Sequence, residues 1–175
     1  MVKDRNLIMI RAQADDLAAV LAMFEDVRAW MISRGVNTWR PIAHWSDLIA
    51  QKIARQAVYL AWLDGQIVGT ITLDKEAEEV WGGAPAQAGY LAHFATCRAQ
   101  AGSGIGAQIL RWAETEARRA GKDYLRLDCW AENPALCAYY ERAGFERRKT
   151  ITLDAFPIAL YEKRISSTEI GASAG

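Results

Sequence analysis

The sequence predicts an α/β fold of the α+β kind, a single domain with a mixed, mostly antiparallel sheet flanked by helices. Three observations carry this prediction. Short β-rich runs alternate with helical segments in the middle of the chain, a hairpin signal precedes them, and two strand-like runs close the chain. With 175 residues, 51% of them apolar, the chain suits one compact core. We expect one domain over residues 1–165 and a disordered Ser/Ala/Gly-rich tail over residues 166–175.

The amino-terminal part predicts a strand and two helices. Leu7–Ile10 is a short apolar run that is typical of a buried strand. Asp15 and Asp16 are typical of a helix start, and six apolar residues then recur at helical spacing until Gly35 ends the pattern. A shorter helix is expected over Ser46–Ala54. The six periodic residues are Leu17, Val20, Leu21, Phe24, Val27 and Met31.

The strongest hairpin signal is Asp64-Gly65, which separates the β-rich runs Val58–Leu63 and Ile67–Leu73. Asp-Gly favours a two-residue turn because both central residues need a positive φ. The polar stretch Lys75–Gln87 contains glycine and proline, and we expect a loop there with room for a strand fragment.

The central part predicts a strand, a glycine-rich turn and a long helix. Tyr90–Cys97 is the strand, and three glycines follow it closely. An apolar stripe then predicts a helix to about Ala120, which Gly121 ends.

The carboxyl-terminal part predicts a strand, a helix and a final pair of strands. Leu125–Cys129 is the strand. The helix covers Pro134–Arg142, with Asn133 at its cap position and Gly144 beyond its end. The last two strands are expected over Phe145–Leu153 and Ile158–Ile165.

The composition excludes several classes of function. Lys plus Arg and Asp plus Glu both number 21, so the chain lacks the basic excess of a dedicated nucleic-acid binder. It shows no signal peptide and no apolar run of membrane length, which predicts a cytoplasmic protein without a membrane partner. Three cysteines without paired spacing suit reduced thiols, and two distant histidines predict that there is no metal site.

The turn Ala101–Gly106 lies between a predicted strand and a predicted helix, where free amide groups and the helix dipole favour an anion. A nucleotide-hydrolase P-loop ends in Gly-Lys-Ser/Thr, which Gly106-Ala107-Gln108 does not match. A dinucleotide fingerprint has G-x-G-x-x-G spacing, whereas this turn has G-x-G-x-G. The spacing suits a pyrophosphate-binding turn of the CoA type, and a glycine-rich connection without a ligand remains the alternative.

A second motif completes a resemblance. The segment Asn133–Phe145 fits the pattern Asn-x(6)-Tyr-x(3)-Gly-Phe. With the Gly-x-Gly-x-Gly turn before it, the chain resembles the GCN5-related N-acetyltransferase (GNAT) family, specifically over about Tyr90–Arg148. One departure is Ala101, where the family commonly has an Arg or Gln that orders the turn around the pyrophosphate. Arg98 and Gln100 are close enough in sequence to compensate.

The resemblance implies an N-acetyltransferase domain over residues 1–165. This domain would transfer an acetyl group from its co-substrate, acetyl-CoA, to a primary amine, and the reaction would need no metal ion. It implies direct attack of the amine on the thioester through a tetrahedral intermediate. A small molecule is the expected acceptor; a protein or peptide acceptor and a non-catalytic acyl-CoA sensor are the alternatives. Homodimers are common in such families. The sequence decides neither the oligomeric state, nor the acceptor, nor the acyl-chain preference.

The resemblance also implies a slot for pantetheine between the strands Tyr90–Cys97 and Leu125–Cys129. Backbone groups near Phe94 and Thr96 would pair with the pantetheine amides. Tyr140 matches the family's usual general acid for the leaving thiolate, because a phenol with an ordinary pKa of about 10 stays protonated at neutral pH; it also suits plain packing against the sheet. The other cofactor-binding residues are Gly102, Ser103, Gly104, Ile105, Gly106 and Asn133, the last of which also suits a plain helix cap.

The general base is less defined than the general acid. His93 is the first candidate, because it lies in the middle of the strand beside the expected slot and titrates near neutrality. Glu78, Glu79 and Asp128 are weaker candidates. The amine can also lose its proton to solvent through a chain of water molecules.

Aromatic residues suggest where an acceptor would bind. Trp30, Trp39 and Trp45 are candidates for the wall of an amine pocket, with core packing as the alternative for at least one of them. A cysteine nucleophile, Cys97 or Cys129 working with His93, is disfavoured because both cysteines lie in buried-looking strands.

Overall fold

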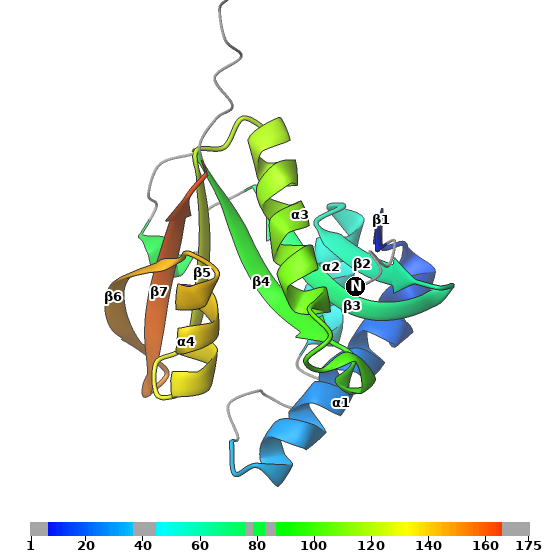
Figure 1. The fold of residues 1–175 in the computed structure, drawn as a ribbon, viewed down its shortest axis with the longest axis horizontal. Helices are drawn as coiled ribbons and strands as arrows, with labels where there is room; N and C mark the ends of the chain where they lie inside the picture. Colours follow the sequence, from blue (N-terminus) through cyan, green and yellow to red (C-terminus); the bar gives the residue numbers. More distant parts are fainter. Residues whose placement is uncertain (1–6, 37–44, 76–78, 83–86, 166–175) are drawn as a thin grey trace, which may run out of the picture. The chain divides into compact units, whose positions relative to one another are not determined.

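Figure 1 shows the fold in a computed structural model, which describes residues 7–36, 45–75, 79–82 and 87–165. Within these residues the chain forms four α-helices and a seven-stranded sheet in the order β1-β2-β3-β4-β5-β7-β6. The mixed α/β fold with its mostly antiparallel sheet is as the sequence predicted. The chain divides into two compact units, Met1–Asp74 with Leu91–Trp112, and Lys75–Tyr90 with Ala113–Gly175. The expected disordered tail lies outside the described residues.

The first unit is built on three antiparallel strands and the end of a fourth, with β1 pairing with β2 and β2 with β3. Asp64 and Gly65 join β2 to β3 with φ of 51° and 79°, as the Asp-Gly signal predicted. Its elements are β1 (Ile8–Arg11), η1 (Ala14–Asp16), α1 (Leu17–Ser33), α2 (Ser46–Ala54), β2 (Val58–Leu63), β3 (Gln66–Asp74), most of β4 (Ala88–Thr96), η4 (Arg98–Gln100) and the first half of α3 (Ile105–Arg119).

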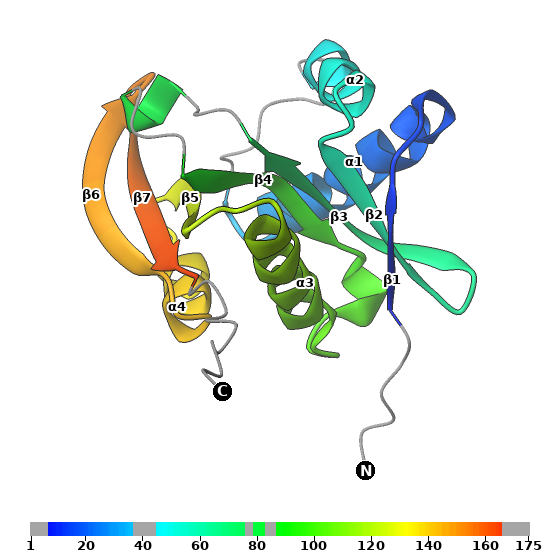
Figure 2. The same ribbon diagram turned by 90° about the horizontal axis from the view of Figure 1, so that it is seen from above.

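Strand β2 is covered on both faces, which explains why it reads as a continuous apolar run. Val58 and Leu60 belong to the cluster that packs against α1 and α2. The alternate residue Tyr59 points the other way, and its ring centroid lies 4.6 Å from that of Trp112 on α3. Figure 2 shows α1 and α2 on one side of these strands and α3 on the other.

Gly69 on β3 allows α3 to approach the sheet closely. A Cβ at this position would lie 2.6 Å from Ile109 Cδ1 and 3.2 Å from the Ala95 carbonyl oxygen, so the Ile109 side chain would have to move to make room for it. Glycine at this position therefore leaves room for the Ile109 side chain of α3 against the strand.

The second unit has β7 at its centre, antiparallel to both β5 and β6. Helix α4 covers one face of these strands, where the ring centroids of Tyr140 and Tyr161 are 6.3 Å apart. Trp81, Tyr90 and Leu160 form a cluster with other apolar residues in this unit. The elements are η3 (Glu79–Trp81), the first residues of β4, the second half of α3, β5 (Tyr124–Trp130), α4 (Pro134–Arg142), β6 (Glu146–Leu153) and β7 (Phe156–Arg164).

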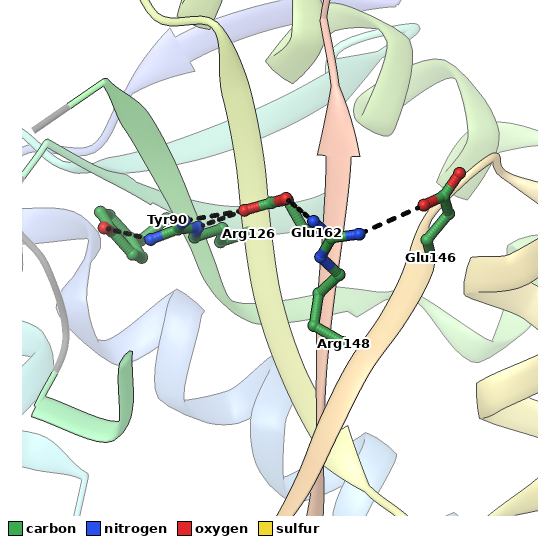
Figure 3. A network of polar contacts seen from close by, with 5 residues as sticks. All are labelled: Tyr90, Arg126, Glu146, Arg148 and Glu162. Carbon is green, nitrogen blue, oxygen red and sulfur yellow. Dashed lines mark hydrogen bonds and ion pairs between the residues drawn. The ribbon is translucent and has the colours of Figure 1, made fainter. Parts of the chain in front are cut away.

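A polar network links residues of four strands in the second unit, β4, β5, β6 and β7 (Figure 3). Glu162 on β7 accepts two contacts of 2.8 Å from Arg126 on β5 and one of 3.2 Å from Arg148 on β6. Tyr90 accepts a weaker hydrogen bond from Arg126, and Glu146 pairs with Arg148. Because the side chains of Arg126 and Glu162 are only 11% and 9% exposed, this pair is an internal ion pair rather than a surface one.

Within the loop expected over Lys75–Gln87, the described residues include a short 3-10 turn, η3. Trp81 explains this turn, since its side chain is buried against Tyr90 with ring centroids 6.5 Å apart. The Arg126 guanidinium lies over the same indole, 4.5 Å from its centroid. Tertiary packing thus decided the conformation of a segment whose own sequence favours a loop.

Candidate functional site

The glycine turn between β4 and α3 is held in shape by its own hydrogen bonds. Ser103 donates twice to the Gln100 carbonyl oxygen, from its amide at 3.1 Å and from its hydroxyl at 2.6 Å. Gly102 and Gly104 have φ of 76° and 82°, a conformation that residues with a Cβ rarely adopt. Glycine is therefore required at both positions by the backbone itself.

The turn presents unpaired amide groups at the start of α3. The Gln108 amide donates to the Gly104 carbonyl oxygen at 3.1 Å and makes the first hydrogen bond of the helical pattern. The amides of residues 105–107 have no acceptor within the helix, and the positive end of the helix dipole lies at the same place. No atom lies within 4 Å of the point where a Cβ on Gly102 or Gly104 would stand. A phosphate group has both donors and room here.

Arg98 lies directly before this turn in η4. Its Cζ is 3.7 Å from the centroid of the Trp30 ring, and its Nε is buried without a hydrogen-bond partner. Ala101 is exposed and has no polar side chain to offer a ligand. An orphaned buried donor beside open glycines and free amides fits the diphosphate of CoA that the sequence resemblance implies.

Five other residues expected to bind the cofactor lie in or next to the turn in the sequence, on β4, in the turn and at the start of α3. Phe94 and Thr96 are half-buried and stand two residues apart at the end of β4. The Ile105 side chain is 3% exposed and belongs to the core, so only its backbone is available to a ligand. Ser103 is exposed, and Gly106 lies in the first turn of α3. The pairing of the β4 backbone with pantetheine stays a prediction.

His93 occupies an irregular position in β4. Its φ of 49° is rare for a residue with a side chain and interrupts the extended strand. The imidazole lies between Trp45 and Phe24, with ring centroids 5.1 Å and 6.1 Å away, and its Nδ1 is 3.3 Å from the Thr72 hydroxyl. The side chain is thus fixed by aromatic contacts on α1 and beside α2.

The surroundings of His93 keep its imidazole uncharged. Burial, and next the positive charge of Lys52, lower the pKa of His93 to about 4, although Asp74 acts in the opposite direction. Lys52 and Asp74 form an ion pair with each other. At neutral pH the imidazole can therefore accept a proton, but it would hold that proton weakly.

Tyr140 is buried on α4 in the second unit, among the rings of Tyr139, Phe145 and Tyr161. Burial raises its pKa above the ordinary value, and the charges of neighbouring groups, Asp128 among them, act in the same direction. The phenol therefore stays protonated throughout the physiological pH range.

Asp128 on β5 is half-buried, and among the described residues its carboxylate has no hydrogen-bond or ion-pair partner. Loss of hydration on burial raises its pKa. Its charge also raises the pKa of Tyr140 and of Cys129, so the carboxylate lies within electrostatic reach of both groups. A desolvated carboxyl group beside a protonated phenol is an arrangement suited to acid–base chemistry.

Asn133 caps α4, which confirms the helix-cap role that the sequence predicted for it. Its side-chain oxygen accepts a hydrogen bond from the Leu136 amide at 3.1 Å, and Pro134 follows in the first turn. A contact with the cofactor stays a prediction.

The three tryptophans predicted to line an acceptor pocket have different surroundings. Trp45 contacts His93 and Phe24. Trp30 is 38% exposed and lies against Arg98, next to the glycine turn. Trp39 lies outside the described residues, as does Glu78, one of the weaker candidates for the base.

The environment of the cysteines argues against a cysteine nucleophile. Burial raises the pKa of Cys97 and of Cys129, so each is held as the thiol rather than the reactive thiolate. The Cys129 and Cys137 sulfur atoms are 3.9 Å apart in the second unit, and all three cysteines are free.

Sequence reasoning missed the polar face of β3. Thr70, Thr72 and Asp74 are all buried and follow one another at every second residue, so their side chains share one face of the strand. Polar residues at every second position of an otherwise apolar strand could have predicted a polar face on β3 from the sequence. They supply the partners of His93 and Lys52.

The part of the chain that the structure describes has neither a metal-binding cluster nor a membrane-spanning helix. No group of three or more His, Cys, Asp or Glu side chains there is arranged to hold a metal ion. None of its helices has the length and apolar character needed to cross a membrane.

Comparison with known proteins points to one family. The model of the acetyltransferase (GNAT) family matches residues 24–145. The uncharacterized N-acetyltransferase YesJ of Bacillus subtilis (strain 168) is 30% identical over 171 residues, which cover 88% of this chain and 93% of that protein. A GNAT-family acetyltransferase from Listeria monocytogenes 4b F2365 has a similar structure, with a TM-score of 0.78, 23% identity, and coverage of 94% of this chain and 98% of that one.

A solved complex has the same fold. The PaiA N-acetyltransferase from Thermoplasma acidophilum, in complex with coenzyme A, matches with a TM-score of 0.69 and 17% identity, over 91% of this chain and 99% of that one.

Proposed function

The chain belongs to the acetyltransferase (GNAT) family, and we propose that it transfers an acetyl group from acetyl-CoA to the primary amine of a small molecule. The observation that carries this proposal is the glycine turn, where open glycines and unpaired amides meet at the start of α3. The coenzyme A bound to the Thermoplasma protein of the same fold supports acetyl-CoA as the co-substrate.

A small acceptor is favoured by the burial of the groups proposed to meet it. His93 and Asp128 are both half-buried, and a slender amine reaches such groups more readily than a folded protein surface does. An unpaired carboxylate also attracts an ammonium group, which is the form that most primary amines take at neutral pH. The acceptor is therefore an amine that enters the protein as a cation.

The proposed reaction is direct transfer. The base first takes a proton from the ammonium group and releases it to solvent. The neutral amine nitrogen then forms a bond to the thioester carbonyl carbon, and the carbon–sulfur bond of the tetrahedral intermediate breaks. The departing sulfur takes a proton from the Tyr140 hydroxyl, the base takes the second proton that the nitrogen loses, and the Tyr140 phenolate regains its proton from solvent. The chain's part is to bind CoA by its phosphates, to supply a proton and to remove one.

Two described residues are the main candidates for the base. His93 was the first choice from the sequence and stays a prediction; its pKa of about 4 makes it a weak proton acceptor. The carboxylate of Asp128, which has no partner among the described residues and whose pKa is raised by burial, supports Asp128 as the base. We propose Asp128 for this role.

Asp128→Asn is expected to lower kcat/KM for the amine about 10- to 100-fold at pH 7, with a smaller loss at high pH, where the amine is already neutral. His93→Gln should cost less than about tenfold. The measurement is kcat/KM from pH 5 to pH 9 at saturating acetyl-CoA for wild type and both variants. The opposite ranking of the two variants would assign the base to His93.

Stability gives an independent check on Asp128. Because its pKa is raised in the folded state, ionisation of the carboxyl group destabilises the fold as pH rises above the unfolded-state pKa. Asp128→Asn removes this penalty, so we expect the variant to be at least as thermally stable as wild type at pH 7. A loss of stability together with activity would indicate a structural role instead.

The whole proposal is tested by acetyl-CoA turnover against a panel of small amines, peptides and aminoglycosides, followed by release of free thiol. Turnover with a small amine is the expected result. Turnover with peptides alone would replace the proposed acceptor class, and CoA binding without any turnover would indicate a sensor.

A further inference from the structure

Arg98, Arg34 and Trp30 form a cluster beside the glycine turn, which we call the arginine–indole cluster. Trp30 lies near the end of α1, and Arg34 is the residue that ends this helix. The Cζ atoms of Arg98 and Arg34 are 3.7 Å and 5.7 Å from the centroid of the same indole ring. Two guanidinium groups thus gather around one aromatic side chain, although Arg98 is distant from both partners in sequence.

The two guanidinium groups of this cluster form no ion pair with the described part of the protein. In the described ranges, neither Arg98 nor Arg34 takes part in an ion pair, whereas Arg28, Arg118, Arg119, Arg126 and Arg148 all have carboxylate partners. Cations that share one ring repel each other unless an anion lies between them. The nearby carboxylate of Asp26, which acts on the pKa of Cys97, pairs with neither arginine. The cluster therefore holds two cations without a directly bound anion, on a chain whose formal net charge is zero.

The position of Arg98 is costly unless a ligand uses it. Its Nε is buried without an acceptor among the described residues, and a buried donor without a partner destabilises a protein. The stack on Trp30 offsets part of this cost and holds the guanidinium plane in one orientation. A pre-oriented guanidinium loses little freedom when it binds a phosphate, which it contacts through two parallel N–H groups.

We infer that the arginine–indole cluster binds a phosphate group of CoA through Arg98, with Arg34 in support, and replaces the side chain that Ala101 lacks. The inference rests on the proposed function. It explains three observations together: the missing polar side chain at Ala101, the two unpaired arginines and the exposed indole between them. Trp30 is then a positioning residue for the CoA site rather than a wall of the acceptor pocket.

The central test is the Kd for CoA of Arg98→Gln, measured by titration calorimetry. We expect binding about 10- to 100-fold weaker than in wild type, because a charge-assisted contact is lost. Pantetheine, which has no phosphate, should bind wild type and variant within about twofold of each other. Trp30→Leu leaves the charge but frees the arginine, so we expect an intermediate loss of about three- to tenfold in CoA affinity.

The matched control is Arg119→Gln. Arg119 is an arginine at the far end of the same helix, with a side chain that is 72% exposed, and its replacement removes the same charge. CoA affinity should stay within about twofold of wild type, because solvent and salt screen a charge that far from the turn. Thermal unfolding of each variant without ligand shows whether the fold is retained. Arg98→Lys keeps the positive charge but loses the planar guanidinium group, so its Kd for CoA shows how much of the affinity depends on guanidinium geometry.

A comparison of CoA with 3′-dephospho-CoA shows which phosphate is bound. If the loss caused by Arg98→Gln disappears with the dephosphorylated ligand, the cluster binds the 3′-phosphate; if the loss persists, it binds the diphosphate. The inference is overturned if Arg98→Gln binds CoA as tightly as wild type, weakens pantetheine equally, or is matched by Arg119→Gln. Wild-type protein that binds no CoA would instead contradict the proposed function.

Discussion

Tyr140→Phe is expected to lower kcat about 100- to 1,000-fold while changing the Kd for CoA less than about threefold. The substitution removes only the hydroxyl that is proposed to protonate the departing sulfur. The hydroxyl has no hydrogen-bond partner among the described residues, and the ring keeps its contacts with Phe145 and Tyr161. The fold and the thermal stability should therefore be unchanged.

Tyr139→Phe is the matched control for this experiment, because it makes the same chemical change one residue earlier on α4. It should leave kcat within about threefold of wild type, since Tyr139 has no role in the proposed proton transfer. A Tyr140→Phe enzyme with wild-type turnover, or a loss confined to CoA affinity, would remove Tyr140 from the mechanism.

The pH dependence of kcat tests the protonation state of Tyr140 independently. Burial raises its pKa above the ordinary value of about 10, so its deprotonation moves to higher pH. The kcat profile should accordingly show no alkaline decline from this group below about pH 10. A decline between pH 7 and pH 9 that Tyr140→Phe abolishes would contradict the environment described for the phenol.

Glu162→Leu is expected to lower the free energy of unfolding by about 3–5 kcal/mol, because it leaves the Arg126 guanidinium buried without its carboxylate. Arg126 is stacked on Trp81 and donates to Tyr90, but Glu162 is the carboxylate that it contacts. Figure 3 shows how closely the two side chains face each other. Urea unfolding followed by circular dichroism measures the effect.

Two further variants separate the buried ion pair from the surface one. Arg148→Gln breaks the contact with the more exposed partner, 52% exposed, and should cost less than about 1 kcal/mol. Adding Arg126→Met to Glu162→Leu removes the stranded charge and should restore much of the lost stability. A small effect of Glu162→Leu alone would show that water reaches Arg126 freely.

Much of the fold was predictable because neighbouring residues decide it. Asp64-Gly65 forms the expected hairpin turn, since two adjacent residues with positive φ are a property of the dipeptide itself. Asn133 caps α4 through a contact only three residues away. The glycine turn was also recognisable, because its backbone geometry needs glycine at Gly102 and Gly104 whatever surrounds it.

The candidate site was predicted in part. The family that the two motifs indicated is shown by the match over residues 24–145. The role of Tyr140 came from that resemblance and stays a prediction. Trp30 and Trp45 were grouped together from residue type alone, whereas the structure puts one against Arg98 and the other against His93. Nothing near either tryptophan in the sequence distinguishes these surroundings.

The sequence by itself determined the order of the elements, their turns and caps, and the two motifs of an acetyltransferase, since each depends on residues close together in the chain. Only the tertiary structure decided which side chains are charged, which have polar partners and which are buried without one. Burial and the charge of Lys52 lower the pKa of His93. The carboxylate of Asp128 is desolvated and has no partner among the described residues. Arg98 stacks on Trp30, which lies on α1, far away in the sequence. Hydration and electrostatic interactions depend on distance in space, which the order of residues does not contain.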